Sequence, residues 1–129
     1  MQSNPKKTGK KTVIIGASPN PWRFSYKAAH MLLAYGHEVI PIGIKKGKIE
    51  GIEIVDIYQT PSIEDVDTVT LYINPNNQLP WYNYILQLSP QRIIFNPGTE
   101  NPELMQKARD KGIEVVPNCT LVMLQSGTF

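Results

Sequence analysis

A short apolar run, an amphipathic segment and a second apolar run follow one another within the first 42 residues. Residues 12–15 form a short, apolar run of β-branched residues, which is typical of a parallel strand buried on both faces. Residues 25–35 carry alanines and leucines at helical spacing, which predicts a helix that ends at Gly36. The pattern of residues 38–42 predicts a second strand. Two strands joined by a helix through tight loops predict a right-handed parallel βαβ unit.

The alternation of strand and helix patterns continues along the rest of the chain. We expect an α/β fold, a Rossmann-like doubly wound parallel five-stranded sheet of order 3-2-1-4-5, in three layers and a single domain. Ser62, with Asp65 three residues later, predicts a helix cap. The remaining expected elements are a turn at 45–51, a short strand or extended segment at 52–58, strands at 68–73, 92–95 and 113–116, and helices at 79–88, at 102–111 and from Cys119 onward.

Composition narrows the class of protein. A chain of 129 residues with 41% hydrophobic and 19% charged residues has room for one packed core. Residues 1–10 predict a flexible, basic, solvated leader containing Lys6, Lys7 and Lys10, ahead of a domain that spans 11–129. The net charge of +2 argues against nucleic acid, and the absence of a long apolar run argues against a membrane span and favours the cytoplasm. A single cysteine excludes an internal disulfide.

The loop after the first predicted strand is the best candidate for a binding site. Ligands of such sheets bind at the carboxyl ends of the strands, near the point where the strand order reverses. Here Gly16 and Ala17 permit a tight turn, Ser18 and Ser25 offer hydroxyl groups, and Arg23 offers a charged donor beside the amides of a helix start. The loop is therefore expected to bind phosphate. The alternative is that it only turns the chain and that Arg23 is solvated.

The same loop departs from the dinucleotide fingerprint G-x-G-x-x-G, because Ser18 and Pro21 replace its second and third glycines. The end of the second strand also lacks the acidic residue that binds a ribose 2′-hydroxyl and carries Lys45 and Lys46 instead. Two lysines suit an additional phosphate, such as the 3′-phosphate of coenzyme A (CoA) or the 2′-phosphate of NADP. A solvated basic turn is the other interpretation.

Two further loops end strands at the same predicted edge. Ile73 and Asn74 follow the third strand, and Pro97 and Gly98 follow the fourth. Polar turn residues and backbone amides at such positions can hydrogen-bond an adenine, a ribose or a pantetheine amide. They can equally be turns without a ligand.

No catalytic or metal site is evident in the sequence. His30 and His37 lack partners at metal-ligand or triad spacing, and Cys119 is more typical of a small packed residue than of a nucleophile. Trp81 and Tyr82 are candidates for the interface of a homodimer.

Several segments together resemble one family. Gly16-Ala17-Ser18 with Arg23, and then residues 36–41 (Gly-His-Glu-Val-Ile-Pro), resemble the bacterial CoA-binding domain proteins. These are stand-alone relatives of the CoA-binding domain of the succinyl-CoA synthetase alpha subunit, and the resemblance runs from about Lys11 to near the C-terminus. Residues 66–69, 101–103 and 116–119 are also similar to segments of that family.

The resemblance implies a Rossmann-like fold that holds CoA between residues 16–25, the end of the second strand and the Ile73-Asn74 pair. It implies no established reaction, and the ligase chemistry of the synthetase needs a further domain and a partner subunit that this chain does not contain. The expected function is binding of CoA or acyl-CoA without catalysis. The alternatives are a small NADP-binding oxidoreductase-like protein and a ligand-free protein-interaction domain.

Overall fold

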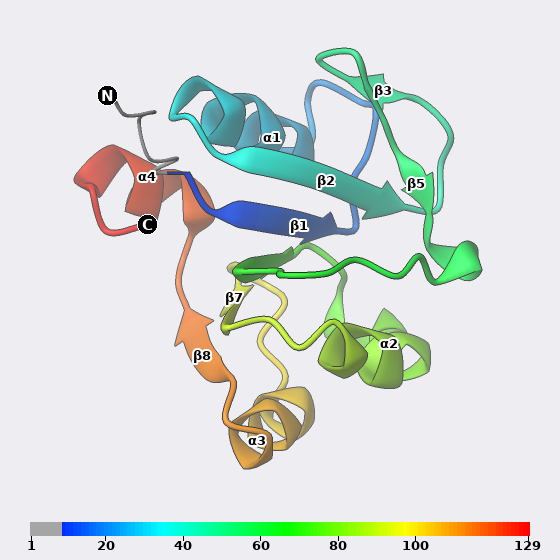
Figure 1. Cartoon of the computed structure of the whole chain (residues 1–129), viewed down its shortest axis with the longest axis vertical. Helices are drawn as coiled ribbons and strands as arrows, with labels where there is room; N and C mark the ends of the chain where they lie inside the picture. Colours follow the sequence, from blue (N-terminus) through cyan, green and yellow to red (C-terminus); the bar gives the residue numbers. More distant parts are fainter. Residues whose placement is uncertain (1–8) are drawn as a thin grey trace, which may run out of the picture.

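A computed structural model describes residues 9–129. Its centre is a six-stranded sheet in the order β5-β2-β1-β6-β7-β8 (Figure 1). Every neighbouring pair is parallel, and the side chains of Val13, Ile14 and Ile15 on the central strand are fully buried. The strands are β1 (Lys11–Ile15), β2 (Glu38–Gly43), β5 (Val55–Asp56), β6 (Thr68–Leu71), β7 (Arg92–Phe95) and β8 (Glu114–Pro117).

Helices cover both faces of this sheet (Figure 1). On one face, Leu32 of α1 and Leu124 of α4 pack in a cluster with Ile14. On the other face, which α2 and α3 cover, Leu104 packs in a cluster with Val13. The predicted three-layer, Rossmann-like α/β fold is confirmed. The helices are α1 (Phe24–Ala34), α2 (Tyr82–Gln87), α3 (Pro102–Asp110) and α4 (Thr120–Ser126).

The predicted strand number and order need correction. Residues 68–73 were expected beside the second strand, but β6 pairs with β1, in the register Thr12 with Thr68. The place beside β2 belongs to β5, a two-residue strand. It lies inside the segment 52–58, which was predicted as a short strand or extended segment but not counted among the five strands of the sheet. The order in which the chain adds strands therefore reverses between β1 and β6, and the carboxyl ends of these two strands mark the switch point.

The segment between β2 and β6 contains little regular structure. A two-stranded hairpin of β3 (Lys48–Ile49) and β4 (Ile52–Glu53) buries Ile49 in the α1 face cluster. One 3-10 turn, η1 (Ile57–Gln59), follows β5 and is capped by Asp56. The helix predicted to start at Ser62 is absent, because the chain has only a few residues between η1 and the start of β6 in which to return to the sheet. The prediction of a helix cap at Ser62 is wrong.

The predicted helix at 79–88 is divided into shorter elements. The 3-10 turns η2 (Pro75–Asn77) and η3 (Leu79–Trp81) precede α2, which starts only at Tyr82. Pro80 has no amide hydrogen to donate, so the α-helical pattern forms only after it. The other helix boundaries agree with expectation, since Gly36 follows α1 in the left-handed region (φ 87°) and Asn101 caps α3.

The amino edge of the sheet joins the two ends of the described chain. The backbone N–H of Lys10 donates to Nδ1 of His37 at 2.9 Å, and Lys10 Nζ contacts the carbonyl oxygen of Phe129. Arg92 donates to the same oxygen at 2.8 Å, and the rings of His37 and Phe129 lie 4.7 Å apart. Lys10 is thus part of the packed structure, and its assignment to a solvated leader is wrong. Lys6 and Lys7 lie outside the described residues. Within residues 9–129 no helix is long and apolar enough to span a bilayer.

Candidate functional site

The loop after β1 is fixed to the strands on both of its sides. The backbone amides of Gly16 and Ala17 both donate to the carbonyl oxygen of Ile42, each at 2.9 Å. On the other side, the amide of Tyr72 donates to the carbonyl oxygen of Ile15 at 2.8 Å. The carboxyl ends of β1, β2 and β6 therefore form one continuous backbone surface at the switch point.

Glycine permits the close approach of these three segments. A β-carbon at Gly43 would lie 2.2 Å from the carbonyl oxygen of Ala17. A β-carbon at Gly16 would lie 2.9 Å from the carbonyl carbon of Tyr72 and 3.1 Å from Cγ1 of Ile73, and Gly16 itself has a φ of 98°. The structure thus brings together three of the predicted site residues, Gly16, Ala17 and Ile73. These short distances also explain why positions 16 and 43 hold glycine and not a residue with a β-carbon.

The start of α1 has no side-chain cap. Arg23 occupies the N-cap position in an extended conformation and its side chain accepts no amide hydrogen bond, while the first turn contains no acidic residue. The first amides of α1 therefore lack the side-chain acceptor that usually satisfies them, and the helix dipole makes this end attractive to an anion. Arg23 is exposed beside it, and Ser25 is buried in the first turn.

Hydrogen bonds within the loop shape its outer part. Ser18 Oγ accepts from the amide of Asn20 at 3.1 Å, and Asn20 Oδ1 accepts from the amide of Trp22 at 3.0 Å. Ser18 keeps its own O–H for a further acceptor, because it accepts rather than donates in this contact. Trp22 is 83% exposed and Phe24 is 67% exposed, so the loop presents apolar as well as polar surface.

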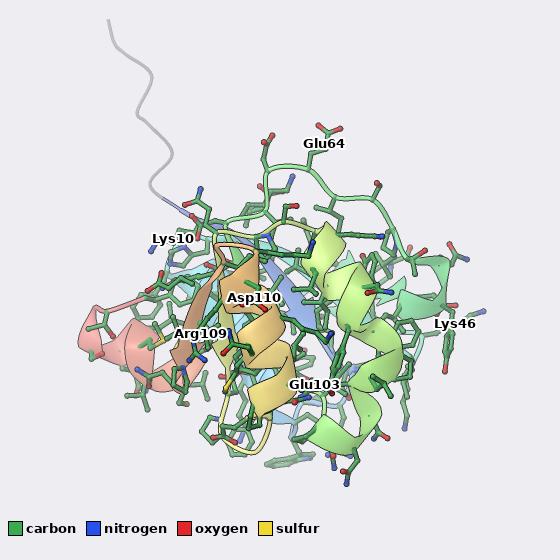
Figure 2. The ribbon with its side chains drawn as sticks, turned by 90° about the horizontal axis from the view of Figure 1, so that it is seen from below. Lys10, Lys46, Glu64, Glu103, Arg109 and Asp110 are labelled. Atoms are coloured by element: carbon green, nitrogen blue, oxygen red, sulfur yellow. The ribbon has the colours of Figure 1, made fainter. Side chains whose placement is uncertain are left out.

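Lys45 and Lys46 lie in the exposed turn after β2. That turn approaches the loop after β1, because a β-carbon at Gly47 would lie 2.4 Å from Cβ of Pro19. Lys46 extends outward at the periphery of the molecule (Figure 2). The sequence interpretation missed one acid here, since Asp56 of β5 is paired with Gly43 at the end of β2. Asp56 is separated from Gly43 by twelve residues of sequence, so only the pairing of β5 with β2 shows that the two are neighbours.

Asn74 lies at the carboxyl edge of the sheet, and one atom of its side chain already takes part in a hydrogen bond. Its Oδ1 accepts from the amide of Asn76 at 2.8 Å, which forms the cap of η2. The side chain is exposed, so its amide group remains accessible to solvent or a ligand. Ile73 is half-buried and packs against the cluster beneath α2 and α3.

Pro97 and Gly98 are less closely associated with the switch point. Both are exposed in the loop after β7, which β6 separates from β1. The amide of Gly98 donates to Oε1 of Glu100 at 2.9 Å, so it is already bonded within its own loop. The structure places these two residues on the predicted edge, but it does not bring them against Gly16.

A buried polar network lies beneath the loops after β6 and β7, and the sequence interpretation missed it. The side chain of Gln78 is fully buried, and its Nε2 donates to the carbonyl oxygens of Ile73 and Thr99, both at 2.8 Å. Nδ2 of Asn101 donates to Oε1 of Gln78 and to the hydroxyl of Tyr82, again at 2.8 Å. The only available signal was the number of Asn and Gln residues around these turns, which does not show which of them are buried.

A second buried amide, that of Asn96, connects the carboxyl edge of the sheet to α4. Asn96 is buried, and its Nδ2 donates to Oγ1 of Thr70 at 2.7 Å and to the carbonyl oxygen of Leu71 at 2.9 Å. Its Oδ1 accepts from the amide of Thr120 at 2.9 Å. Burial raises the pKa of the neighbouring Tyr72 to about 12, against smaller lowering effects from hydrogen bonds with the two threonines. The polar side chains under the edge are thus held by one another.

The two histidines lie in different parts of the fold. His37 is at the amino edge, where burial is the main cause of its lowered pKa and the charges of Lys10 and Arg92 lower it further. His30 is exposed on α1 and contacts Glu50 of the β3–β4 turn. Among the described residues no group of three or more His, Cys, Asp or Glu side chains is placed to hold a metal ion.

The two aromatic residues suggested for a homodimer interface differ in their surroundings. Tyr82 is buried, and its hydroxyl donates to Oε1 of Glu103 at 3.0 Å. It is a core residue, so its assignment to an interface is wrong. Trp81 is partly buried and packs edge-on against the exposed ring of Tyr58, with ring centroids 5.2 Å apart. Cys119 is a free, partly buried thiol.

Comparison with known proteins places this site in a family. A family model described as a CoA binding domain matches residues 10–125, which include all the loops described above. The chain belongs to the CoA-binding domain family. The resemblance seen in the sequence is thereby confirmed, and the family's match extends over the switch point and the network beneath it.

Solved structures extend the comparison for this CoA-binding domain. It is similar to the crystal structure of an uncharacterized protein, with 57% identity, a TM-score of 0.91 and coverage of 95% of this chain and 99% of that chain. A conserved hypothetical protein from Pyrococcus furiosus is 25% identical, with a TM-score of 0.76 and coverage of 88% and 97%.

A larger protein contains the same fold. The dinucleotide-forming acetyl-coenzyme A synthetase 1 of Ca. Korarchaeum cryptofilum, solved in complex with phosphate and ADP, is 19% identical with a TM-score of 0.65. The match covers 85% of this chain and 26% of that chain, so it shows a shared fold within one part of the synthetase. None of the curated proteins matches the chain.

Proposed function

We propose that this chain binds CoA or an acyl-CoA at the carboxyl ends of β1, β2 and β6, and that it has no catalytic activity of its own. The observation that carries the proposal is the uncapped start of α1, with Arg23 beside it, at the switch point of a domain from the CoA-binding domain family. Nucleotide phosphates need such backbone donors together with a cation, and both are present here.

Each part of the ligand has candidate partners. The diphosphate would bind at the first amides of α1, with Ser18 and Arg23, where Gly16 and Ala17 allow a close backbone approach. Ser25, whose side chain is buried, would support the first turn rather than donate from the surface. The exposed ammonium group of Lys45 is free to approach the 3′-phosphate. The chemistry of this donor set fits a polyanionic nucleotide.

The remainder of the ligand would extend toward the loops after β6 and β7. Ile73 offers an apolar surface beside Gly16, and Asn74 offers an exposed amide for the amides of the pantetheine arm. Pro97 and Gly98 lie farther along the same edge and would contact only the distal end of the arm or an acyl group. A purely binding role agrees with the position of His37 at the opposite, amino edge of the sheet.

The test is isothermal titration calorimetry of the purified protein with CoA, dephospho-CoA, NADP and NAD. CoA should bind more tightly than dephospho-CoA if Lys45 contacts the 3′-phosphate. The Arg23→Ala variant should weaken CoA binding by about 1.5 to 3 kcal/mol, or about tenfold to more than a hundredfold, as expected for a charged hydrogen bond.

The matched control is Arg109→Ala, which removes an exposed arginine from α3 (Figure 2). It should leave the affinity for CoA unchanged. Binding of NADP alone would replace the proposal with an oxidoreductase-like function. Absence of binding by all four nucleotides would leave the protein-interaction alternative.

A further inference from the structure

The loops after β6 and β7 are connected by one buried side chain. We infer that Gln78 is a positioning residue, whose amide holds these two loops in the arrangement that the pantetheine arm of CoA requires. The inference rests on the proposed function and extends it from the residues that would touch the ligand to one that would not. Gln78 is fully buried, so it can act only through the loops it joins.

The hydrogen bonds of Gln78 have the geometry of a bridge. One amide nitrogen donates to the carbonyl oxygen of Ile73, in the loop after β6, and to that of Thr99, in the loop after β7, each at 2.8 Å. The side-chain oxygen accepts from Asn101, which also caps the start of α3. We call these three contacts the Gln78 bridge. Both hydrogens of the amide and its oxygen are thereby used inside the protein.

The surroundings make this bridge sensitive to substitution. The side chain of Ile73 is the apolar surface proposed for the pantetheine arm, so a shift of its carbonyl would also move that surface. Thr99 is buried and is bonded to the carbonyl of Asn96 through both its amide and its hydroxyl. Without the bridge, two carbonyl oxygens would lose a donor in a site with little access for water, which favours rearrangement of both loops.

The same geometry predicts a local effect. The loop after β1 is held separately, by the amides of Gly16 and Ala17 on Ile42. Removal of the bridge should therefore weaken contacts with the pantetheine arm and leave the phosphate end unchanged. Adenosine 3′,5′-bisphosphate, which lacks the arm, is the probe that separates the two ends.

The test compares Gln78→Met, which keeps the length of the side chain and removes its amide, with Gln78→Glu, which keeps an acceptor for Asn101 and has at most one hydrogen to donate in place of two. The matched control is Tyr82→Phe, which removes a hydroxyl from the outer end of the same network and leaves the bridge intact. Both Gln78 variants should raise the Kd for CoA about tenfold and that for adenosine 3′,5′-bisphosphate less than about twofold. The control should leave the ratio of the two affinities unchanged.

A second measurement does not depend on ligand binding. Amide hydrogen exchange followed by NMR should be at least about tenfold faster at Asn77 and Thr99 in the Gln78 variants, and unchanged at Tyr72, whose amide is bonded to β1. Equal losses for both ligands, or unchanged exchange at Asn77 and Thr99, would overturn the positioning role. Absence of CoA binding by the wild-type protein would refute the proposed function instead, while the exchange rates would still decide whether the bridge holds the loops.

Discussion

Replacement of Gly43 by alanine should disrupt the switch point while leaving the chemistry of the loop unchanged. The new β-carbon would lie 2.2 Å from the carbonyl oxygen of Ala17, so the two must separate by about 0.8 Å to reach the 3.0 Å at which real contacts begin. If the loop after β1 shifts away from β2 by this amount, the 2.9 Å hydrogen bonds from Gly16 and Ala17 to Ile42 are weakened or lost.

The expected loss of stability follows from these contacts. Overpacking costs about 1 to 3 kcal/mol and each lost hydrogen bond costs about 0.5 to 1.5 kcal/mol, which together lower the free energy of unfolding by about 2 to 6 kcal/mol. For a domain of this size that corresponds to a fall in Tm of about 8 °C or more. Urea denaturation and differential scanning calorimetry measure the two quantities, and CoA titration should show loss of binding in the variant that remains folded.

Gly51→Ala is the control for this experiment. Gly51 has a φ of 82°, and no atom lies within 4 Å of the place that a β-carbon would occupy, so alanine there introduces backbone strain without a clash. It should cost only about 1 to 2 kcal/mol and leave ligand affinity unchanged. A Gly43→Ala protein as stable as the wild type, or no less stable than Gly51→Ala, would refute the close-approach explanation of the site.

Two further predictions concern pH. His37 has a lowered pKa in the folded protein, so the unfolded chain binds more protons as pH falls below about 6.5; stability should decline there, and urea midpoints for His37→Gln should show a flatter decline. The pKa of Tyr72 is raised to about 12 in the folded protein, so the unfolded chain ionises first above about pH 10. Stability should therefore fall between about pH 10 and 12, and a Tyr72→Phe variant with an undiminished alkaline decline would contradict that assignment.

Most of the architecture was accessible from the sequence because it is encoded locally. The run at residues 12–15 and the glycine at position 36 specify a buried strand and a helix end without reference to the rest of the chain. The position of residues 68–71 beside β1 was not accessible, because the pattern of residues 52–58 does not show that a short strand within them pairs with β2. Strand order is a property of long-range pairing, which short strands do not reveal.

The candidate site also combines residues that the local sequence predicts with residues that only long-range contacts reveal. The loop after β1 was predicted because its small residues and arginine directly follow a buried strand. Gln78 and Asn96 were missed because an amide side chain in a polar turn is usually solvated, and only the assembled sheet shows that these two are buried. Lys10 was misassigned for a similar reason, since its partners His37 and Phe129 are distant in sequence.

The contact between Lys10 and Phe129 also has a practical consequence for how the domain can be handled. Both residues lie at the amino edge of the sheet, because Lys10 contacts His37 just before β2 and Phe129 contacts Arg92 at the start of β7. The loops after β1, β2 and β6 follow the other ends of the strands, about 15 Å away for a strand of this length. A surface tether or a fused domain attached at residue 129 would therefore lie at the opposite edge of the sheet from the candidate site. Immobilised in this way, the domain would present the carboxyl ends of β1, β2 and β6 outward to a ligand in solution.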